Sequence, residues 1–190
     1  MYARAESYGM NVPNAITSVR ILLVPFLAYL LLHGAYGAAI WVFLAAGVSD
    51  ALDGFIARRF NLCTRVGAVL DPLADKMLIV VSVLTLAWRG LLPWWLAFVI
   101  AGRDLIIVGG AAAYALRAGR VEMEPSVPSK VNTGVQITLV LVVLGTAAGV
   151  IRTAGWLPAL FGIAFVTTVV SGVHYVVVWG LRAAAARKSG

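Results

Sequence analysis

Four long stretches of this sequence contain no Asp, Glu, Lys or Arg, and they constrain the fold more than any other feature. They cover residues 21–49, 77–88, 131–151 and 153–181. A helix that crosses a bilayer needs about 20 predominantly apolar residues, because the hydrocarbon core offers no water to its backbone. The run His33-Gly34-Ala35-Tyr36-Gly37 interrupts the first stretch, which therefore predicts two helices joined by a tight turn.

Composition excludes several classes of protein. Hydrophobic residues make up 62% of the chain and charged residues 12%, whereas soluble domains average roughly 45–50% and 25%. This composition excludes a soluble globular protein, a disordered tail and a nucleic-acid binder. The net charge of +7 comes from sparse basic residues at the ends of apolar runs, which favours anionic lipid head groups as partners. Cys63 is the single cysteine, so no intrachain disulfide is expected.

The pattern predicts an all-α, polytopic integral membrane protein with six transmembrane helices. One domain is expected over residues 1–190, with residues 1–13 as a polar juxtamembrane segment. The predicted spans lie near residues 16–33, 38–60, 67–88, 92–117, 130–151 and 157–180.

The basic residues predict the orientation. With six spans, both termini and the second and fourth loops share one side, which carries ten of the fifteen Lys and Arg residues. Only Arg89 and Arg152 fall on the opposite side. Because Lys and Arg are enriched in cytoplasmic loops, both termini are expected to be cytoplasmic.

Five carboxylates fall inside predicted spans, where each costs about 2.5–3.5 kcal/mol at a helix centre. They are Asp50, Asp53, Asp71, Asp75 and Asp104. The first two are three residues apart and the next two are four apart, so each of these pairs shares one helical face. One pair ends the second span and the other begins the third, so both are expected near the cytoplasmic surface.

Four clustered carboxylates suit Mg²⁺ or Mn²⁺, and two such ions would balance their charge. Two-metal sites of this kind hold a phosphoryl group during in-line displacement. The alternative is a structural network of these acids with nearby cations, namely Arg58, Arg59, Arg65 and Lys76. Gly54, Ala57 and Gly67 leave room for a large ligand, although small residues also serve helix packing.

The segment reads Asp50-Ala-Leu-Asp53-Gly54-Phe-Ile-Ala57-Arg58, then eight residues, Gly67, three residues, Asp71, three residues and Asp75. It resembles the CDP-alcohol phosphotransferase signature, D-x2-D-G-x2-A-R-x8-G-x3-D-x3-D, at every fixed position. The resemblance implies a six-span enzyme that transfers a phosphatidyl group from a CDP-linked lipid to an alcohol and releases CMP. It further implies that the four aspartates bind two divalent metals and that Asp75 is the general base. The implied CDP-binding residues are Gly54, Ala57, Arg58, Thr64 and Gly67.

Other segments bear on the acceptor alcohol. Residues 12–25 resemble the opening shared by phosphatidylglycerophosphate synthases and the cardiolipin synthases of this superfamily. Gly102-Arg103-Asp104 and the segment from Ser129-Lys130 to Gln136 look closer to the mitochondrial-type cardiolipin synthases. The resemblance therefore favours CDP-diacylglycerol and phosphatidylglycerol as substrates, with glycerol-3-phosphate as the alternative acceptor. It also implies a homodimer, and the absence of a transit peptide favours a bacterial plasma-membrane enzyme with a cytoplasmic active site.

Arg103, Ser129 and Lys130 are the candidate residues for the phosphate of the acceptor. An ion pair of Arg103 with Asp104 and an interfacial anchor role for Lys130 are the alternatives. A divalent-cation or proton transporter is a rival function, because intramembrane acids also mark ion pathways, but these acids cluster at one end of the spans. A non-catalytic membrane scaffold is a further rival.

Overall fold

The computed structural model describes residues 11–60, 67–118 and 126–188. Within these ranges it describes the side chains of residues 22–49, 76–110 and 126–178. In these segments every regular element is an α-helix, which confirms the predicted all-α class. The helices are α2 (Asn11–Leu32), α3 (Tyr36–Phe60), α4 (Gly67–Trp88), α5 (Trp94–Ala118), α6 (Val127–Ala147) and α7 (Leu157–Lys188).

The six predicted spans correspond to these helices one for one, and the differences lie at the ends. Helix α2 begins at Asn11 rather than near residue 16, and α7 continues to Lys188 rather than ending near residue 180. Residues 183–186 are all alanine, the best helix former, so the helix continues past the apolar stretch. Helix α6 ends at Ala147 rather than near residue 151 because a glycine turn stops it.

Three glycine turns join α2 to α3, α4 to α5 and α6 to α7 with the same hydrogen bonds. In the last of these, the Gly149 amide donates to the Thr146 carbonyl at 3.1 Å and the Val150 amide donates to the Gly145 carbonyl at 2.9 Å. These two bonds define the Schellman motif, which needs a residue with positive φ after the helix. Gly149 supplies it with φ +74°, and Gly34 and Gly90 do so in the other two turns.

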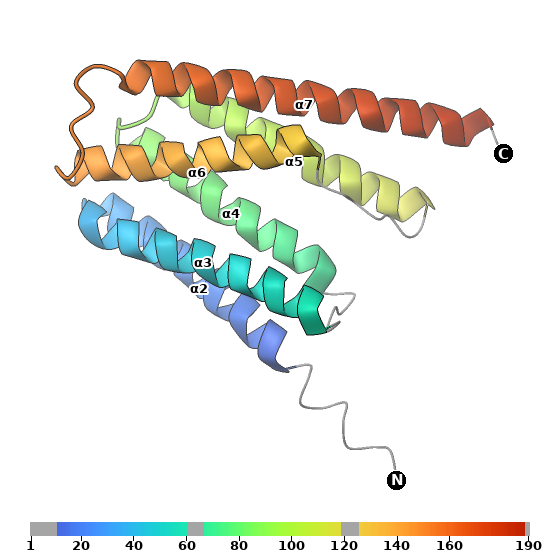
Figure 1. Cartoon of the computed structure of the whole chain (residues 1–190), viewed down its shortest axis with the longest axis horizontal. Coiled ribbons are helices and arrows are strands. Elements are labelled where there is room, and N and C mark those ends of the chain that lie inside the picture. Colours follow the sequence, from blue (N-terminus) through green and yellow to red (C-terminus); the bar gives the residue numbers. More distant parts are fainter. Residues whose placement is uncertain (1–10, 61–66, 119–125, 189–190) are drawn as a thin grey trace, which may run out of the picture.

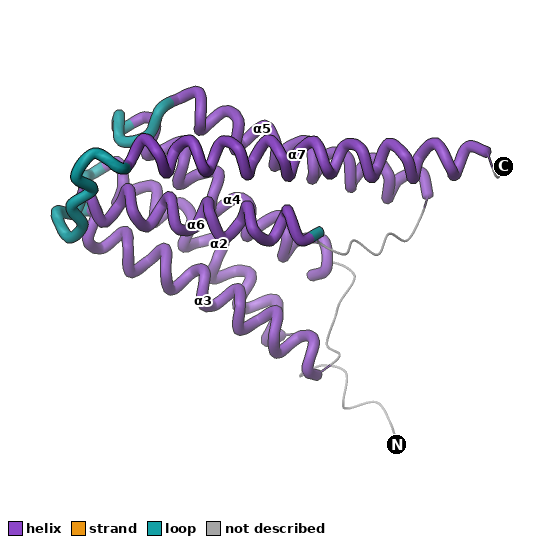
Figure 2. The backbone as a smooth tube through the Cα atoms, turned by 45° about the horizontal axis from the view of Figure 1, so that its top comes forward, coloured by secondary structure: helices purple, strands orange, loops and turns teal. Residues whose placement is uncertain are grey.

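All three turns gather at one end of the helix bundle, the left end in Figure 2. We call it the turn end, and it comprises residues 33–35, 89–93 and 148–156. The start of α2, the end of α7, the end of α3 and the start of α4 lie at the opposite end (Figure 1). Successive helices therefore run antiparallel, and α5 and α7 run in the same direction.

Helix α6 holds the bundle together, because it contacts α3, α4 and α7, while α5 packs on α4 and α7. The buried core draws on all six helices. It includes Leu31 of α2, Phe43 of α3, Leu86 of α4, Ile100 of α5, Leu144 of α6 and Ala164 of α7. The outer faces are also apolar, and Trp88, Trp94, Trp95 and Trp156 are exposed near the turn end.

Two of the helical segments are long and apolar enough to cross a membrane by themselves. They are Val127–Ala147 and Leu157–Val178, within the part of the chain that the structure describes. Shorter apolar stretches occur at Leu22–Leu32, Tyr36–Ser49 and Lys76–Trp88.

The last turn of α6 is tightly packed, and this generates a stability prediction. A Cβ atom on Gly145 would lie 2.6 Å from Ile151 Cδ1 and 2.9 Å from its Cγ1, whereas a Cβ on Gly134 of the same helix meets nothing within 4 Å. We expect Gly145→Ala to lower the free energy of unfolding by about 1–3 kcal/mol through overpacking. The matched control, Gly134→Ala, should raise it by about 0.5–1 kcal/mol through helix propensity.

Thermal unfolding of the purified protein in detergent measures both effects. Adding Ile151→Ala to Gly145→Ala should recover part of the lost stability, because it removes the atoms in conflict. Equal unfolding temperatures for Gly145→Ala and Gly134→Ala would contradict the packing described for this turn.

Candidate active site

The acidic motif lies on two neighbouring helices at the end of the bundle opposite the turn end. Asp50 and Asp53 lie in the second half of α3, and Asp71 and Asp75 lie in the first half of α4. Helices α3 and α4 contact each other. The backbone thus confirms that each pair lies within one continuous helix, and the convergence of the four carboxylates stays a prediction. Gly54, Ala57 and Arg58 are also in α3 and Gly67 opens α4, whereas Thr64 lies outside the described residues.

One turn of α4 beyond Asp71, a charged cluster begins at Lys76. Lys76 Nζ lies 3.6 Å from Asp104 Oδ1, which joins α4 to α5. Arg103 Nη1 donates to the same Asp104 oxygen at 2.6 Å. This arrangement confirms the ion pair that was the alternative interpretation of Arg103.

The guanidinium of Arg103 also binds the two remaining helices of this half of the bundle. Its Nη2 donates to Ser129 Oγ of α6 at 2.8 Å and to Ser171 Oγ of α7 at 2.6 Å. We call Lys76, Arg103, Asp104, Ser129 and Ser171 the arginine cluster. It links α4, α5, α6 and α7 at a single level of the bundle.

Burial explains why these groups pair. Arg103 is 5% exposed and Asp104 is 4% exposed, and an uncompensated charge in such a place costs several kcal/mol. Asp104 is shared by Arg103 and Lys76, so its carboxylate links α4 to α5 through two basic side chains.

The three candidate residues for the acceptor phosphate are only partly brought together. Arg103 and Ser129 are hydrogen-bonded, as the prediction requires. Lys130 is exposed on the next position of α6, and among the described residues its side chain makes no hydrogen bond to Arg103 or Ser129. Ser171 was not among the candidates, because its contact with Arg103 joins residues 68 positions apart.

A second polar group lies one turn further toward the turn end, between α6 and α7. Thr168 Oγ1 donates to Asn132 Oδ1 at 2.9 Å, and Gln136 Nε2 lies 3.5 Å from Thr168 Oγ1. Ser129, Asn132 and Gln136 are spaced three and four residues apart, which places them on one face of α6. That spacing was visible in the sequence and could have identified this buried polar seam.

Two buried donors have no hydrogen-bond partner among the described residues. They are Arg103 Nε and Asn132 Nδ2. A buried donor without an acceptor costs about 1–3 kcal/mol, so this region favours a ligand that brings acceptor oxygens. The site thus combines a buried arginine, two donors without a partner among the described residues and an acidic motif on α3 and α4.

Comparison with known proteins places the chain in a family with this acidic motif. Residues 10–173 match the family model described as CDP-alcohol phosphatidyltransferase. The chain therefore belongs to the CDP-alcohol phosphatidyltransferase family, as the motif resemblance predicted.

Curated relatives with similar sequences carry the name cardiolipin synthase (CMP-forming). The rat protein is 35% identical over 183 residues and the human protein is 34% identical over 183 residues, with 87% of this chain covered in both cases. A Streptomyces coelicolor protein with the same name is 37% identical over 109 residues, which cover 53% of this chain and 51% of the relative. The matched region spans 60% of the rat and human proteins.

The arginine cluster generates a second stability prediction. We expect Asp104→Asn to lower the free energy of unfolding by about 3–5 kcal/mol, because Arg103 and Lys76 lose the carboxylate that compensates them. The control Arg89→Gln removes an exposed cation that donates to Tyr36 Oη at 3.2 Å and should cost about 0.5 kcal/mol or less.

Thermal unfolding in detergent distinguishes these variants. Asp104→Leu alone leaves the buried Arg103 cation without its carboxylate. Combining it with Arg103→Met should restore part of the lost stability, because the pair is then apolar. An unfolding temperature for Asp104→Asn equal to that of the wild type would show that the ion pair does not hold these helices.

Proposed function

We propose that this protein is a cardiolipin synthase (CMP-forming) that transfers the phosphatidyl group of CDP-diacylglycerol to phosphatidylglycerol. The observation that carries the proposal is the complete acidic motif on two contacting helices, α3 and α4, in a chain of the CDP-alcohol phosphatidyltransferase family. The names of the rat, human and Streptomyces relatives support the choice of substrates.

The proposal places all six helices across a bacterial plasma membrane, with both termini and the active site cytoplasmic. The apolar outer faces and the exposed tryptophans near the turn end support a membrane location. Arg89 and Arg152 are the basic residues at the turn end, whereas the acidic motif lies at the opposite, more basic end. The excess of Lys and Arg there supports a cytoplasmic assignment.

The donor set of the motif fits divalent cations. Asp50, Asp53, Asp71 and Asp75 offer hard carboxylate oxygens, and their positions lie within one turn of each other on each of two neighbouring helices. Two bound Mg²⁺ or Mn²⁺ ions would neutralise the diphosphate of the donor and polarise the phosphorus that is attacked. In this proposal Gly54, Ala57, Arg58, Thr64 and Gly67 hold the CDP portion.

The reaction proceeds by direct attack. A hydroxyl of the acceptor forms a bond to the β-phosphorus of CDP-diacylglycerol, the bond from that phosphorus to the bridging oxygen breaks, and CMP leaves. Asp75 accepts the proton of the attacking hydroxyl as the general base. Its neighbour Lys76 contacts Asp104, so the arginine cluster adjoins the proposed base.

In this proposal the acceptor phosphate is held between α5 and α6, beside Arg103 and Ser129. Arg103 and Ser129 lie together there, and Lys130 is the third group that this proposal assigns to the acceptor. The buried Arg103 Nε, which has no hydrogen-bond partner among the described residues, supports an acceptor that brings anionic oxygens. The proposal also includes a homodimer, which cross-linking in native membranes can test.

Offering two acceptors separately tests the function. Purified protein with CDP-diacylglycerol and Mg²⁺ or Mn²⁺ should form cardiolipin and CMP when phosphatidylglycerol is supplied. Lipid products and CMP are measured by mass spectrometry and chromatography. Product from glycerol-3-phosphate alone would instead assign phosphatidylglycerophosphate synthesis, and ion flux in proteoliposomes without any lipid product would favour a transporter.

Substituting the proposed base tests the mechanism. Asp75→Asn keeps the size of the side chain but cannot accept the proton, so we expect turnover to fall by about 10²–10⁴-fold. Glu124→Gln, which makes the same chemical change in a polar segment of the sequence, should retain activity. Steady-state CMP release measures both variants, and wild-type turnover in Asp75→Asn would remove Asp75 from the mechanism.

A further inference from the structure

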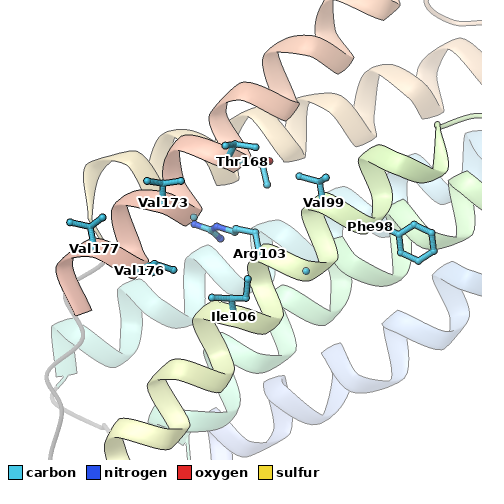
Figure 3. Close-up of a pocket in the computed structure, with 11 residues that line it drawn as sticks. Phe98, Val99, Arg103, Ile106, Thr168, Val173, Val176 and Val177 are labelled. Atoms are coloured by element: carbon cyan, nitrogen blue, oxygen red, sulfur yellow. The ribbon is translucent and has the colours of Figure 1, made fainter. Parts of the chain in front are cut away.

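A groove of about 470 Å³ runs between α5 and α7 (Figure 3). Its walls are apolar, with Phe98 and Ile106 on α5 facing Val173 and Val177 on α7. These four side chains are more than half exposed, so the groove opens to the surroundings of the bundle. In a membrane those surroundings are lipid acyl chains.

Arg103 is the only charged residue among the described residues that line this groove. Figure 3 shows its side chain reaching from α5 toward α7. Gly172 lies beside it, and a Cβ atom at that position would be in ordinary van der Waals contact with Arg103 Cγ at 3.5 Å. The apolar groove and the arginine cluster therefore meet at Arg103.

The dimensions of the groove match one half of a bilayer. The lining residues of α5 run from Phe98 to Ile106, about 12 Å at the helical rise of 1.5 Å per residue, close to the roughly 15 Å depth of one hydrocarbon leaflet. A molecule that is anionic at one end and apolar along its length, as a phospholipid is, fits this combination. A helix of a second copy, with apolar residues alone, would leave the buried Arg103 Nε donor without an acceptor among the described residues.

The groove is separate from α3, the helix that carries the first half of the acidic motif. Among the described residues α3 contacts α2, α4 and α6, whereas the groove lies between α5 and α7. The arginine cluster connects the two regions, because Lys76 of α4 contacts Asp104 of α5. This placement favours the acceptor over the CDP-linked donor as the molecule in the groove.

We propose that the groove between α5 and α7 holds an acyl chain of the acceptor phospholipid, whose phosphate lies beside Arg103. The acceptor then reaches the active site laterally from the bilayer, and the groove selects a lipid over a water-soluble acceptor. This inference rests on the proposed phosphatidyl transfer and deepens it by assigning a place to the apolar part of one substrate.

Gly102 offers a direct test, because it lines the groove and a Cβ atom there meets nothing within 4 Å. The side chain in Gly102→Leu would occupy the groove without entering the core. We expect the KM for phosphatidylglycerol to rise at least about tenfold, since each methylene group excluded from an apolar site weakens binding about fourfold. The KM for CDP-diacylglycerol should stay unchanged. Turnover of glycerophosphoglycerol, the deacylated acceptor, should equal that of the wild type.

The matched control is Gly162→Leu on α7. A Cβ atom at Gly162 also meets nothing within 4 Å, and this residue does not line the groove. Its kinetics should follow the wild type. Val173→Trp narrows the groove from the opposite wall and should reproduce the pattern of Gly102→Leu, which keeps the test decisive if one of the two variants folds poorly.

The outcomes separate this inference from the function on which it rests. If the wild type releases no CMP with any acceptor, the proposed function fails. If the wild type makes cardiolipin but both groove variants keep its KM for phosphatidylglycerol, or raise only that for CDP-diacylglycerol, the groove assignment is overturned. Disulfide cross-linking between copies through Val173→Cys in a Cys63→Ser background would also overturn it, because a second copy would then fill the groove.

Discussion

A charge placed among apolar helices must find a partner, and the arrangement of α4 to α7 depends on this constraint. Arg103 is almost completely buried, and its guanidinium binds Asp104, Ser129 and Ser171 on three helices. Asp104 in turn contacts Lys76 on the fourth. Apolar packing alone has little directional preference, whereas these short contacts exist at one relative height of the helices. The arginine cluster therefore fixes the relative heights of α4, α5, α6 and α7 along the bundle.

The two ends of the bundle have different tasks. The turn end closes with three Schellman turns, which satisfy the last carbonyls of α2, α4 and α6 within the chain itself. The opposite end carries the acidic motif on α3 and α4, and the arginine cluster lies on the same side of the core. A hydrogen-bonded turn end and a charged opposite end suit the proposed enzyme, which acts on head groups at one membrane surface.

Much of the fold was predictable because its determinants are local. Stretches without charge predicted six helices, and the run around Gly34 predicted the turn between the first two. The end of α6 was predicted four residues too late. Gly149 lies within an apolar stretch, and a hydrophobic pattern does not reveal its positive φ. The end of α7 was placed too early, because a run of alanines extends a helix without marking its limit.

The sequence by itself determined the family and the acidic motif, because helical spacing turns positions 50, 53, 71 and 75 into pairs on two successive helices. It also singled out Arg103 and Ser129 without showing that they touch. Only the tertiary structure decided that Arg103 binds Ser171, that Thr168 joins Asn132, and that α5 and α7 leave a groove between them. Each of these joins residues on different helices, and the relative positions of helices follow from packing of the whole bundle rather than from any local pattern.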